Sequence, residues 1–238
     1  MFAKRSEEPE LMDELSLSGN ALKQNLDELE VINKWLGGNE VVTDALDQLR
    51  QMPVFKPFSG KQLKIADLGC GGGDILREVA QWSKKRQQPV ALTGIDANAF
   101  MINYATGKCS SWPQIQLLQQ DIFSENFKNE QYDIVICSLF CHHFTNQQLI
   151  QMLQQFYSQA ILAVIITDLH RHPLAYYSIK WLTAGFSKSY LVKNDAPLSV
   201  LRAFRKKELE QLLLQAGIKN FRLKWRWAFR WQLILIKE

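Results

Sequence analysis

The chain has 238 residues and a formal net charge of +4, from 28 lysine and arginine residues against 24 aspartate and glutamate residues. Its hydrophobic content of 47% and charged content of 22% are ordinary for a soluble globular protein with a sizeable core. The length favours one domain, or one domain with an extra lobe, and the mild positive charge does not by itself indicate a nucleic-acid ligand.

The sequence carries no pattern of a targeting or membrane-spanning segment. The first fourteen residues are charged and lack the apolar core of a signal peptide. The longest apolar run, residues 160–166, has the length of a buried strand and falls far short of the roughly 20 residues of a membrane helix. The four cysteines show no disulfide spacing, so we expect reduced thiols in a cytoplasmic protein.

The N-terminal part reads as an arm followed by a helical cap. Residues 1–15 are acidic and are expected to form the arm. Residues 19–36 place leucine and isoleucine at steps of three and four, which predicts an amphipathic helix. A second short helix is expected at 41–49, and two prolines after it mark a linker. We therefore assign residues 1–58 to the arm and cap, and residues 59–238 to the main domain.

From Lys64 onward, strands and helices alternate. The expected strands are 63–68, 89–95, 115–118, 132–137 and 161–167. The expected helices are 74–84, 99–106, 146–159 and 206–216. Such alternation implies βαβ units and a parallel sheet with right-handed crossovers.

Two further segments depart from this alternation. The stretch of about residues 169–205 is too long for an ordinary loop, and it combines a helical pattern with a polar loop at 193–197, so we expect a lid insertion. Residues 221–236 alternate between aromatic or apolar side chains and basic ones, which predicts a hairpin with one buried and one solvated face. No Gly, Pro or Asn near Ala228 fixes the position of its turn.

The rest of the chain is organised around a glycine-rich turn. A short apolar strand ends at Asp67, glycines follow at Gly69, Gly71 and Gly73, and a helix begins directly after them. Glycine permits positive φ and leaves no Cβ in the way of a ligand, and the helix N-terminus points its N–H groups into the same space. The order D-x-G-x-G-x-G differs from the dinucleotide fingerprint G-x-G-x-x-G, and no Lys-Ser/Thr follows it as in a Walker phosphate loop.

Three acids, Asp67, Asp96 and Asp121, stand at the C-terminal ends of successive strands. That edge of an open α/β sheet is where ligands bind. A single Asp there is commonly a helix cap, but three at equivalent strand ends after a glycine turn favour a binding site. Asp96 lies where a carboxylate can accept both hydroxyls of a ribose.

Four segments together resemble a known family. D-L-G-C-G-G-G-D, G-I-D, Q-D-I and Y-D-I-V-I-C-S, at residues 67–74, 94–96, 120–122 and 132–138, stand in the order and spacing of the class I S-adenosylmethionine-dependent methyltransferases. The resemblance covers residues 60–170 well. It implies an α/β fold with a doubly wound, mostly parallel sheet of seven strands and an antiparallel last strand, here with an N-terminal helical cap and a helical lid insertion. It also implies S-adenosyl-L-methionine as the cofactor.

The resemblance assigns roles by position. The methionine and ribose part of the cofactor would pass along the glycines, and Asp96 would hold the ribose hydroxyls. Asp121 would take the adenine amino group with Ile122 beside the ring, and Ser138 and Leu139 would border the methionine end. The complete expected set of cofactor-binding residues is Asp67, Gly69, Cys70, Gly71, Gly73, Asp96, Ala97, Asp121, Ile122, Ser138 and Leu139.

Methyl transfer needs alignment, a dry pocket and, where the acceptor must lose a proton, a base. His142 follows the fourth strand and His170 the fifth, so these two are the catalytic candidates, although a structural role fits each of them as well. Arg171 and Arg202 would hold an anionic or phenolic acceptor, or would pair with local acids. The cysteines near His142 match no zinc spacing, and we expect no metal.

The insertion is rich in aromatic residues, which would line a pocket for an apolar or aromatic acceptor or form the core of the lid. The insertion, residues 9–13 and residues 168–173 also resemble bacterial methyltransferases found with polyketide or quinone pathways. We therefore expect methyl transfer to a small, aromatic or polyketide/quinone-like acceptor, with O-methylation favoured. The alternatives are a C-methyltransferase of a quinone pathway, an RNA methyltransferase, and a catalytically inactive cofactor-binding protein.

The expected partners follow from the same reading. A strand with one buried aromatic face explains the aromatic–basic alternation at 221–231 more simply than a nucleic-acid platform does, so a small-molecule acceptor is favoured over nucleic acid. We expect a monomer or a homodimer without a membrane span.

Overall fold

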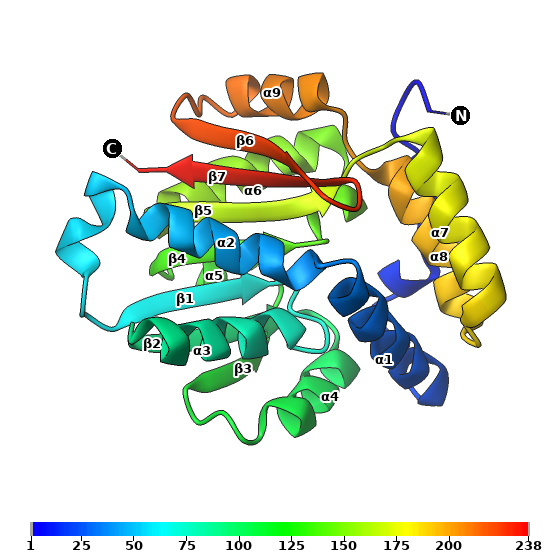
Figure 1. Ribbon diagram of the computed structural model, residues 1–238, viewed down its shortest axis with the longest axis horizontal. Coiled ribbons are helices and arrows are strands. Elements are labelled where there is room, and N and C mark those ends of the chain that lie inside the picture. The colour runs from blue at the N-terminus through cyan, green and yellow to red at the C-terminus, as the bar shows by residue number, and fades with distance from the viewer. Residues whose placement is uncertain (1, 238) are drawn as a thin grey trace.

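The computed structural model describes residues 2–237. Its centre is a seven-stranded sheet in the order β3-β2-β1-β4-β5-β7-β6 (Figure 1). The strands are β1 (Leu63–Leu68), β2 (Val90–Asp96), β3 (Ile115–Gln119), β4 (Tyr132–Ser138), β5 (Ala160–Leu169), β6 (Phe221–Arg226) and β7 (Arg230–Ile236). The first five strands pair in parallel, whereas β7 runs antiparallel to both β5 and β6. The predicted seven-stranded sheet with an antiparallel last strand is confirmed.

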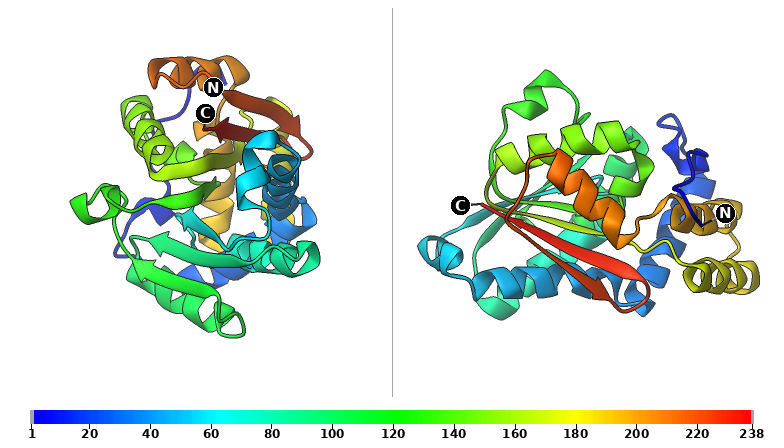
Figure 2. Two further views of the ribbon diagram at one scale, coloured as in Figure 1. Left: turned by 90° about the vertical axis from the view of Figure 1, so that its left-hand side faces the viewer. Right: turned by 90° about the horizontal axis from the view of Figure 1, so that it is seen from above.

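Helices cover both faces of the sheet and enclose one apolar core on each face (Figure 2). The helices on one face are α2 (Gly38–Arg50), α3 (Asp74–Arg86) and α4 (Ala99–Cys109), and those on the other are α5 (Glu125–Lys128), α6 (Asn146–Gln159) and α9 (Lys206–Gln215). Because the central strands are buried on both sides, they read in the sequence as near-continuous apolar runs rather than as alternating ones.

The helical cap and the lid lie at the end of the sheet toward which the parallel strands point (Figure 1). The arm contains η1 (Leu11–Asp13), the cap contains α1 (Asn20–Trp35), and η2 (Pro53–Phe58) leads from α2 into β1. The insertion folds into α7 (Pro173–Phe186) and α8 (Tyr190–Arg202), and α8 packs against both η1 and α1. Each helix within residues 2–237 is too short or too polar to cross a membrane.

The polar loop predicted at 193–197 is wrong, because these residues belong to α8. Ser189 caps this helix through its side chain, which accepts the N–H of Val192. Asp195 is buried, and its carboxylate accepts the backbone N–H groups of Leu11 and Met12 at 2.9 and 3.0 Å. The polar residue Asp195 thus forms a contact between the lid and the N-terminal arm. Such a long-range contact cannot be predicted from local sequence patterns.

The N-terminal arm is docked onto the main domain rather than extended into solvent. The N–H of Ser6 donates to the carbonyl of Leu201. The guanidinium of Arg5 donates to the carbonyl oxygens of Arg202, His142 and Phe144. Residues of the arm therefore lie against both the lid and the loop after β4.

The C-terminal hairpin turns at residues 227–229, between Arg226 and Arg230. Ala228 and Phe229 both adopt left-handed φ values, 59° and 55°, which cost about 1–2 kcal/mol each for residues with a Cβ. The predicted buried aromatic face is wrong for Trp225 and Trp227, which are 48% and 76% exposed. β6 forms the edge of the sheet, whereas β7 lies between β5 and β6 and is buried along its whole length.

Candidate functional site

A cavity of about 710 Å³ lies at the C-terminal ends of the parallel strands. Its walls come from the glycine-rich turn, the loop after β4, the arm, α1, both lid helices and the turn of the C-terminal hairpin. In an open α/β sheet this is the expected position of a ligand site, since the chain crosses from one face of the sheet to the other between β1 and β4. The N-terminal cap and the lid insertion close the cavity on the side away from the sheet.

The glycine-rich turn connects β1 to α3 and is fixed to the neighbouring strand. The N–H groups of Gly69 and Cys70 both donate to the carbonyl of Ile95, at 2.9 and 3.1 Å. Gly69 has φ +68°, and a Cβ built on it would collide with the ring of Phe140. The turn therefore needs glycine at this position for both the backbone conformation and the space.

Asp67 places a buried carboxylate on the wall of the cavity, and Asp96 a partly buried one. Asp96 accepts the N–H groups of Gly71 and Asn98 at 3.0 and 2.9 Å, and burial raises its pKa above the ordinary value. Burial and the nearby carboxylates of Asp74 and Asp96 raise the pKa of Asp67 well above its ordinary range. Among residues 2–237, Asp67 Oδ2 has no hydrogen-bond partner. A cationic ligand group would reduce the electrostatic repulsion between these carboxylates and stabilise their charged forms.

This environment fits S-adenosyl-L-methionine, which carries an ammonium and a sulfonium. Seven of the predicted cofactor residues line the cavity, namely Asp67, Gly69, Cys70, Gly71, Asp96, Ser138 and Leu139. Leu139 has φ +51°, an uncommon conformation that is often retained at functional sites. The remaining four predicted residues, Gly73, Ala97, Asp121 and Ile122, lie outside the cavity lining. Asp121 is exposed and accepts the N–H of Phe123, so its proposed role toward adenine stays a prediction.

His142 is held in one orientation by Asp168. Its Nδ1 lies 2.7 Å from Asp168 Oδ1, and its backbone N–H donates to Asp168 Oδ2 at 3.1 Å. Because a carboxylate accepts hydrogen bonds, we assign the ring proton to Nδ1, which leaves Nε2 with a free lone pair. Burial disfavours the charged form of Asp168, but the electrostatic attraction of His142 and its hydrogen bond favour that form more strongly. The pKa of Asp168 therefore lies below its ordinary value. His142 also lines the cavity.

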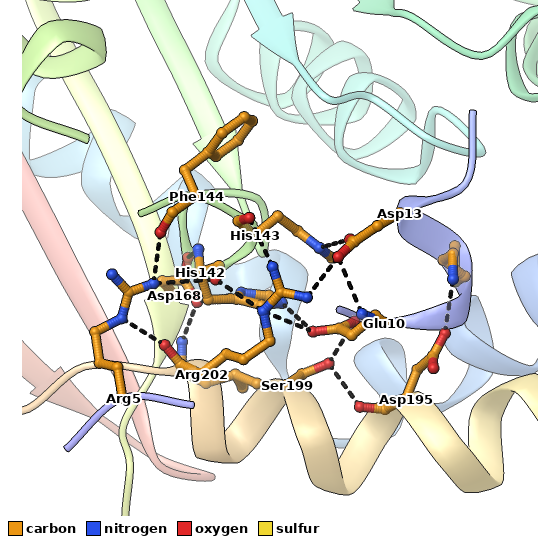
Figure 3. A network of polar contacts seen from close by, with 12 residues as sticks. Arg5, Glu10, Asp13, His142, His143, Phe144, Asp168, Asp195, Ser199 and Arg202 are labelled. Carbon is orange, nitrogen blue, oxygen red and sulfur yellow. Dashed lines mark hydrogen bonds and ion pairs between the residues drawn. The ribbon is translucent and has the colours of Figure 1, made fainter. Parts of the chain in front are cut away.

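The arm contributes two acids to the same place (Figure 3). Glu10 Oε1 lies 3.6 Å from His142 Nε2 and 3.8 Å from Arg202 Nε, and burial raises the pKa of Glu10 to about 7. Asp13 accepts from His143 Nδ1 at 2.6 Å and from Arg202 Nη1 at 2.5 Å. Although burial works against its charge, these two hydrogen bonds hold the pKa of Asp13 well below the ordinary range. Neither acid was among the predicted site residues, and the signals that the sequence offers are the acidic composition of the arm and the resemblance noted for residues 9–13.

Three potential ligand atoms for a metal, one each from Glu10, His142 and His143, lie within 4.8 Å of one another. Both imidazoles are already hydrogen-bonded through Nδ1, and the guanidinium of Arg202 supplies positive charge beside Glu10. These residues therefore belong to an acid–base network within the chain, in which Glu10 Oε1 has no hydrogen-bond partner among residues 2–237.

The other predicted residues either lie outside the cavity lining or form ion pairs with acids of the chain. His170 accepts from Trp225 Nε1 at 3.3 Å and does not line the cavity. Arg171 forms an ion pair with Glu208 at 2.5 Å. Arg202 is paired with Asp13, so neither arginine offers a free cation to an acceptor. Instead, the buried Arg230, which the sequence patterns did not single out, lines the cavity.

The chain is similar to known proteins in both sequence and fold. Residues 65–160 match the model of a family described as "Methyltransferase domain". The chain is 32% identical over 165 residues to a ubiquinone biosynthesis O-methyltransferase from Rickettsia canadensis, and the alignment covers 68% of this chain and 65% of the relative. It is 25% identical over 182 residues to a carboxy-S-adenosyl-L-methionine synthase from Wolinella succinogenes, which covers 69% of this chain and 72% of that protein.

The fold is similar to that of solved structures. An O-methyltransferase family protein from Burkholderia thailandensis superposes with a TM-score of 0.64 and 14% identity, covering 98% of this chain and 65% of that one. At this identity the similarity concerns the fold. It includes the cap and the lid, because nearly the whole chain is superposed.

Proposed function

Because the chain belongs to the class I S-adenosylmethionine-dependent methyltransferases, we propose that it methylates an oxygen atom of a small aromatic or polyketide/quinone-like acceptor. The observation that carries this proposal is the position of His142, which lines the cavity while Asp168 holds the Nδ1 side of its ring and leaves Nε2 as the nitrogen that can accept a proton. An oxygen acceptor must lose a proton, and a positioned imidazole is the commonest protein base for that step.

The residues of the chain would act as follows. When bound, S-adenosyl-L-methionine supplies a methyl group that is already activated by its sulfonium. Asp67 and Asp96 would hold the cationic and ribose ends of that molecule, and the glycine-rich turn would let it approach the backbone. Closure of the cavity by the cap and the lid would keep water away from the reacting atoms.

His142 would then take the proton of the acceptor hydroxyl onto Nε2 as the new oxygen–carbon bond forms. The resulting imidazolium would be stabilised by Asp168, whose depressed pKa keeps it ionised at neutral pH. Positioned general bases of this kind contribute typically 10²–10⁴-fold to a rate.

The lining of the cavity supports a small acceptor with an apolar body. Its apolar side chains come from the cap, the lid and the hairpin turn, namely Leu29, Ile32, Leu36, Ile179, Leu182 and Phe229. Such a pocket encloses a ring or a short acyl chain better than a polynucleotide. Methylation of carbon in a quinone pathway would use the same base at an acidic carbon and is the nearest alternative.

The test is a product assay with labelled methyl donor. The purified protein, methyl-labelled S-adenosyl-L-methionine and a set of hydroxylated aromatic and polyketide-like compounds should give label in an organic-soluble product and an equal amount of S-adenosylhomocysteine. Label on RNA, or cofactor binding without turnover across the set, would contradict the proposal. One relative is named a carboxy-S-adenosyl-L-methionine synthase, so the set should include carboxylic acids as donors of a carboxyl group, and the cofactor pool should be analysed by mass spectrometry. A carboxylated cofactor, formed with loss of the carboxyl group from one of these acids, would identify that activity instead.

A further inference from the structure

Arg230 is a buried cation on the wall of the cavity. It opens β7, pairs with Leu169 of β5 in the sheet, and is 2% exposed. Its Nη1 donates to the carbonyl of Leu36 at 3.3 Å, and its Nη2 donates to Asn33 Oδ1 at 3.1 Å. Among residues 2–237, Nε has no hydrogen-bond partner. Both partners of the guanidinium are neutral, so its charge is uncompensated.

Three other arginines, none of which lines the cavity, differ in this respect. Arg202 pairs with Asp13, Arg171 with Glu208, and Arg77 with Glu30. Within residues 2–237, no carboxylate lies within 4.0 Å of the Arg230 guanidinium. Asp168 attracts it electrostatically but is hydrogen-bonded to His142. Burial accordingly lowers the pKa of Arg230 to about 10, which marks an environment that an anion would stabilise.

The surroundings of Arg230 make room for the guanidinium inside the protein. A Cβ on Gly38 would lie 2.9 Å from Arg230 Nη2, so glycine at the start of α2 leaves the space that this side chain occupies. Directly before Arg230, Ala228 and Phe229 hold the left-handed conformations of the hairpin turn. Figure 1 shows this turn beside the junction of α1 and α2. The backbone thus retains two unfavourable conformations next to a cation that is kept away from solvent.

We propose that Arg230 binds a carboxylate of the methyl acceptor. A carboxylate can take two parallel N–H donors of a guanidinium, and the free Nε–H of Arg230 with a neighbouring Nη–H offers such a pair. The apolar residues of α1, α7 and the hairpin turn would hold the body of the acceptor, and His142 would face its reacting hydroxyl. The proposal rests on the proposed function and narrows it to hydroxylated aromatic or polyketide-like acids.

The carboxylate on the methionine part of the methyl donor is a second group that could bind Arg230. Arg230 lies at the start of β7, which is separated from β1 by the two strands β4 and β5, whereas the glycine-rich turn follows β1 directly. The acceptor carboxylate is therefore the partner that we assign. The two sources are separated by the affinity for S-adenosylhomocysteine, which carries the same methionine carboxylate and no acceptor.

The experiment measures binding and needs no turnover. The full chain, saturated with S-adenosylhomocysteine, is titrated with 4-hydroxybenzoate, salicylate and 2-naphthoate, each against its neutral carboxamide. We expect at least one carboxylate to bind about tenfold more tightly than its amide, as a charge-assisted contact provides. Arg230→Gln should remove this preference, and Arg230→Lys should retain part of it. Arg222→Gln, at an exposed site on β6, should change nothing.

Three outcomes would overturn the proposal. One is equal binding of every acid and its amide by the wild type, or binding of none. Another is a preference for the carboxylate that survives in Arg230→Gln. The third is a large loss of S-adenosylhomocysteine affinity in Arg230→Gln, which would assign the arginine to the methyl donor. If Arg230→Gln does not fold, the wild type and Arg230→Lys still decide the question. Carboxylate binding without any methyl transfer would refute the proposed function but not the anion site.

Discussion

His142 and Asp168 are linked twice, once through the imidazole Nδ1 and once through the backbone N–H of His142, although they are 26 residues apart in the chain. Both bonds go to one carboxylate at the end of β5, and both residues are buried. The ring therefore cannot turn without breaking a charge-assisted bond, and its Nε2 stays directed away from Asp168. A fixed tautomer and a fixed direction are what a general base requires.

Replacing His142 should affect the chemical step and spare cofactor binding. With an acceptor found in the product assay, His142→Ala should lower kcat by roughly 10²–10⁴-fold, because the hydroxyl proton then has no positioned acceptor. The affinity for S-adenosylhomocysteine, measured by calorimetry, should stay within about threefold of wild type. His170→Ala is the matched control and should keep nearly the full rate, since its ring lies outside the cavity lining. Full activity in His142→Ala would remove this histidine from the mechanism.

Deprotonation of Glu10 should make the methylation rate increase as the pH is raised through neutrality. Below its pKa of about 7 the protonated carboxyl can donate to His142 Nε2 and occupy the lone pair that the mechanism uses, whereas the carboxylate cannot. His142 and His143 face it from the loop after β4, Arg202 and Ser199 from α8, and Asp13 from η1. The rate should therefore increase as the pH passes through about 7.

Glu10→Gln tests this dependence, because its amide N–H can donate to His142 at every pH. The variant should be slow, by about tenfold or more, even above pH 8, and its rise near neutral pH should be lost. Glu8→Gln changes an exposed acid of the same arm and should leave the pH–rate profile as in wild type.

Because burial raises the pKa of Glu10, folding favours its protonated form. Its contribution to stability is present below the unfolded pKa of about 4.3 and is lost as the pH rises through about 7.

Local patterns were sufficient for the residues around the glycine-rich turn. Asp67 and Asp96 were expected at one place because each lies near the C-terminal end of a strand and strand ends in a parallel sheet meet at one edge, and both line the cavity. Their contact with a cofactor stays a prediction. The same reasoning selected His142 after the fourth strand, but it selected His170 after the fifth strand as well, since the sequence does not show which side chain turns toward the cavity.

The residues that were missed depend on contacts across long stretches of chain. Asp13 meets His143 over a separation of 130 residues, and Arg230 meets Asn33 over 197. No local period encodes such pairs. The turn of the hairpin was also missed, because Ala228 and Phe229 adopt a conformation that glycine or asparagine would normally signal. In each case, tertiary packing determines the position of the side chain.

Asp96 should be required for stabilisation by the cofactor. Saturating S-adenosyl-L-methionine should raise the melting temperature of the wild type, since a ligand that binds only the folded state stabilises it. Asp96→Ala should abolish the shift, because the variant loses the carboxylate of the cavity wall and the hydrogen bond to Gly71. Asp121→Ala, measured in the same way, tests the proposed contact of Asp121 with adenine. An unchanged shift in that variant would contradict the role toward adenine proposed for Asp121, and a reduced one would support it.

Gly69 and Gly71 form a matched pair for testing the turn itself. Both have positive φ, +68° and +48°, so alanine at either should cost about 1 kcal/mol in backbone strain. Only at Gly69 does the added Cβ collide with another side chain, the ring of Phe140. Gly69→Ala should therefore lower stability and cofactor affinity more than Gly71→Ala, in chemical denaturation and calorimetry. Phe140→Ala in the Gly69→Ala background should recover part of the stability, since it removes the colliding ring. Equal losses in the two single variants would show that strain alone, and not the contact with Phe140, makes glycine necessary here.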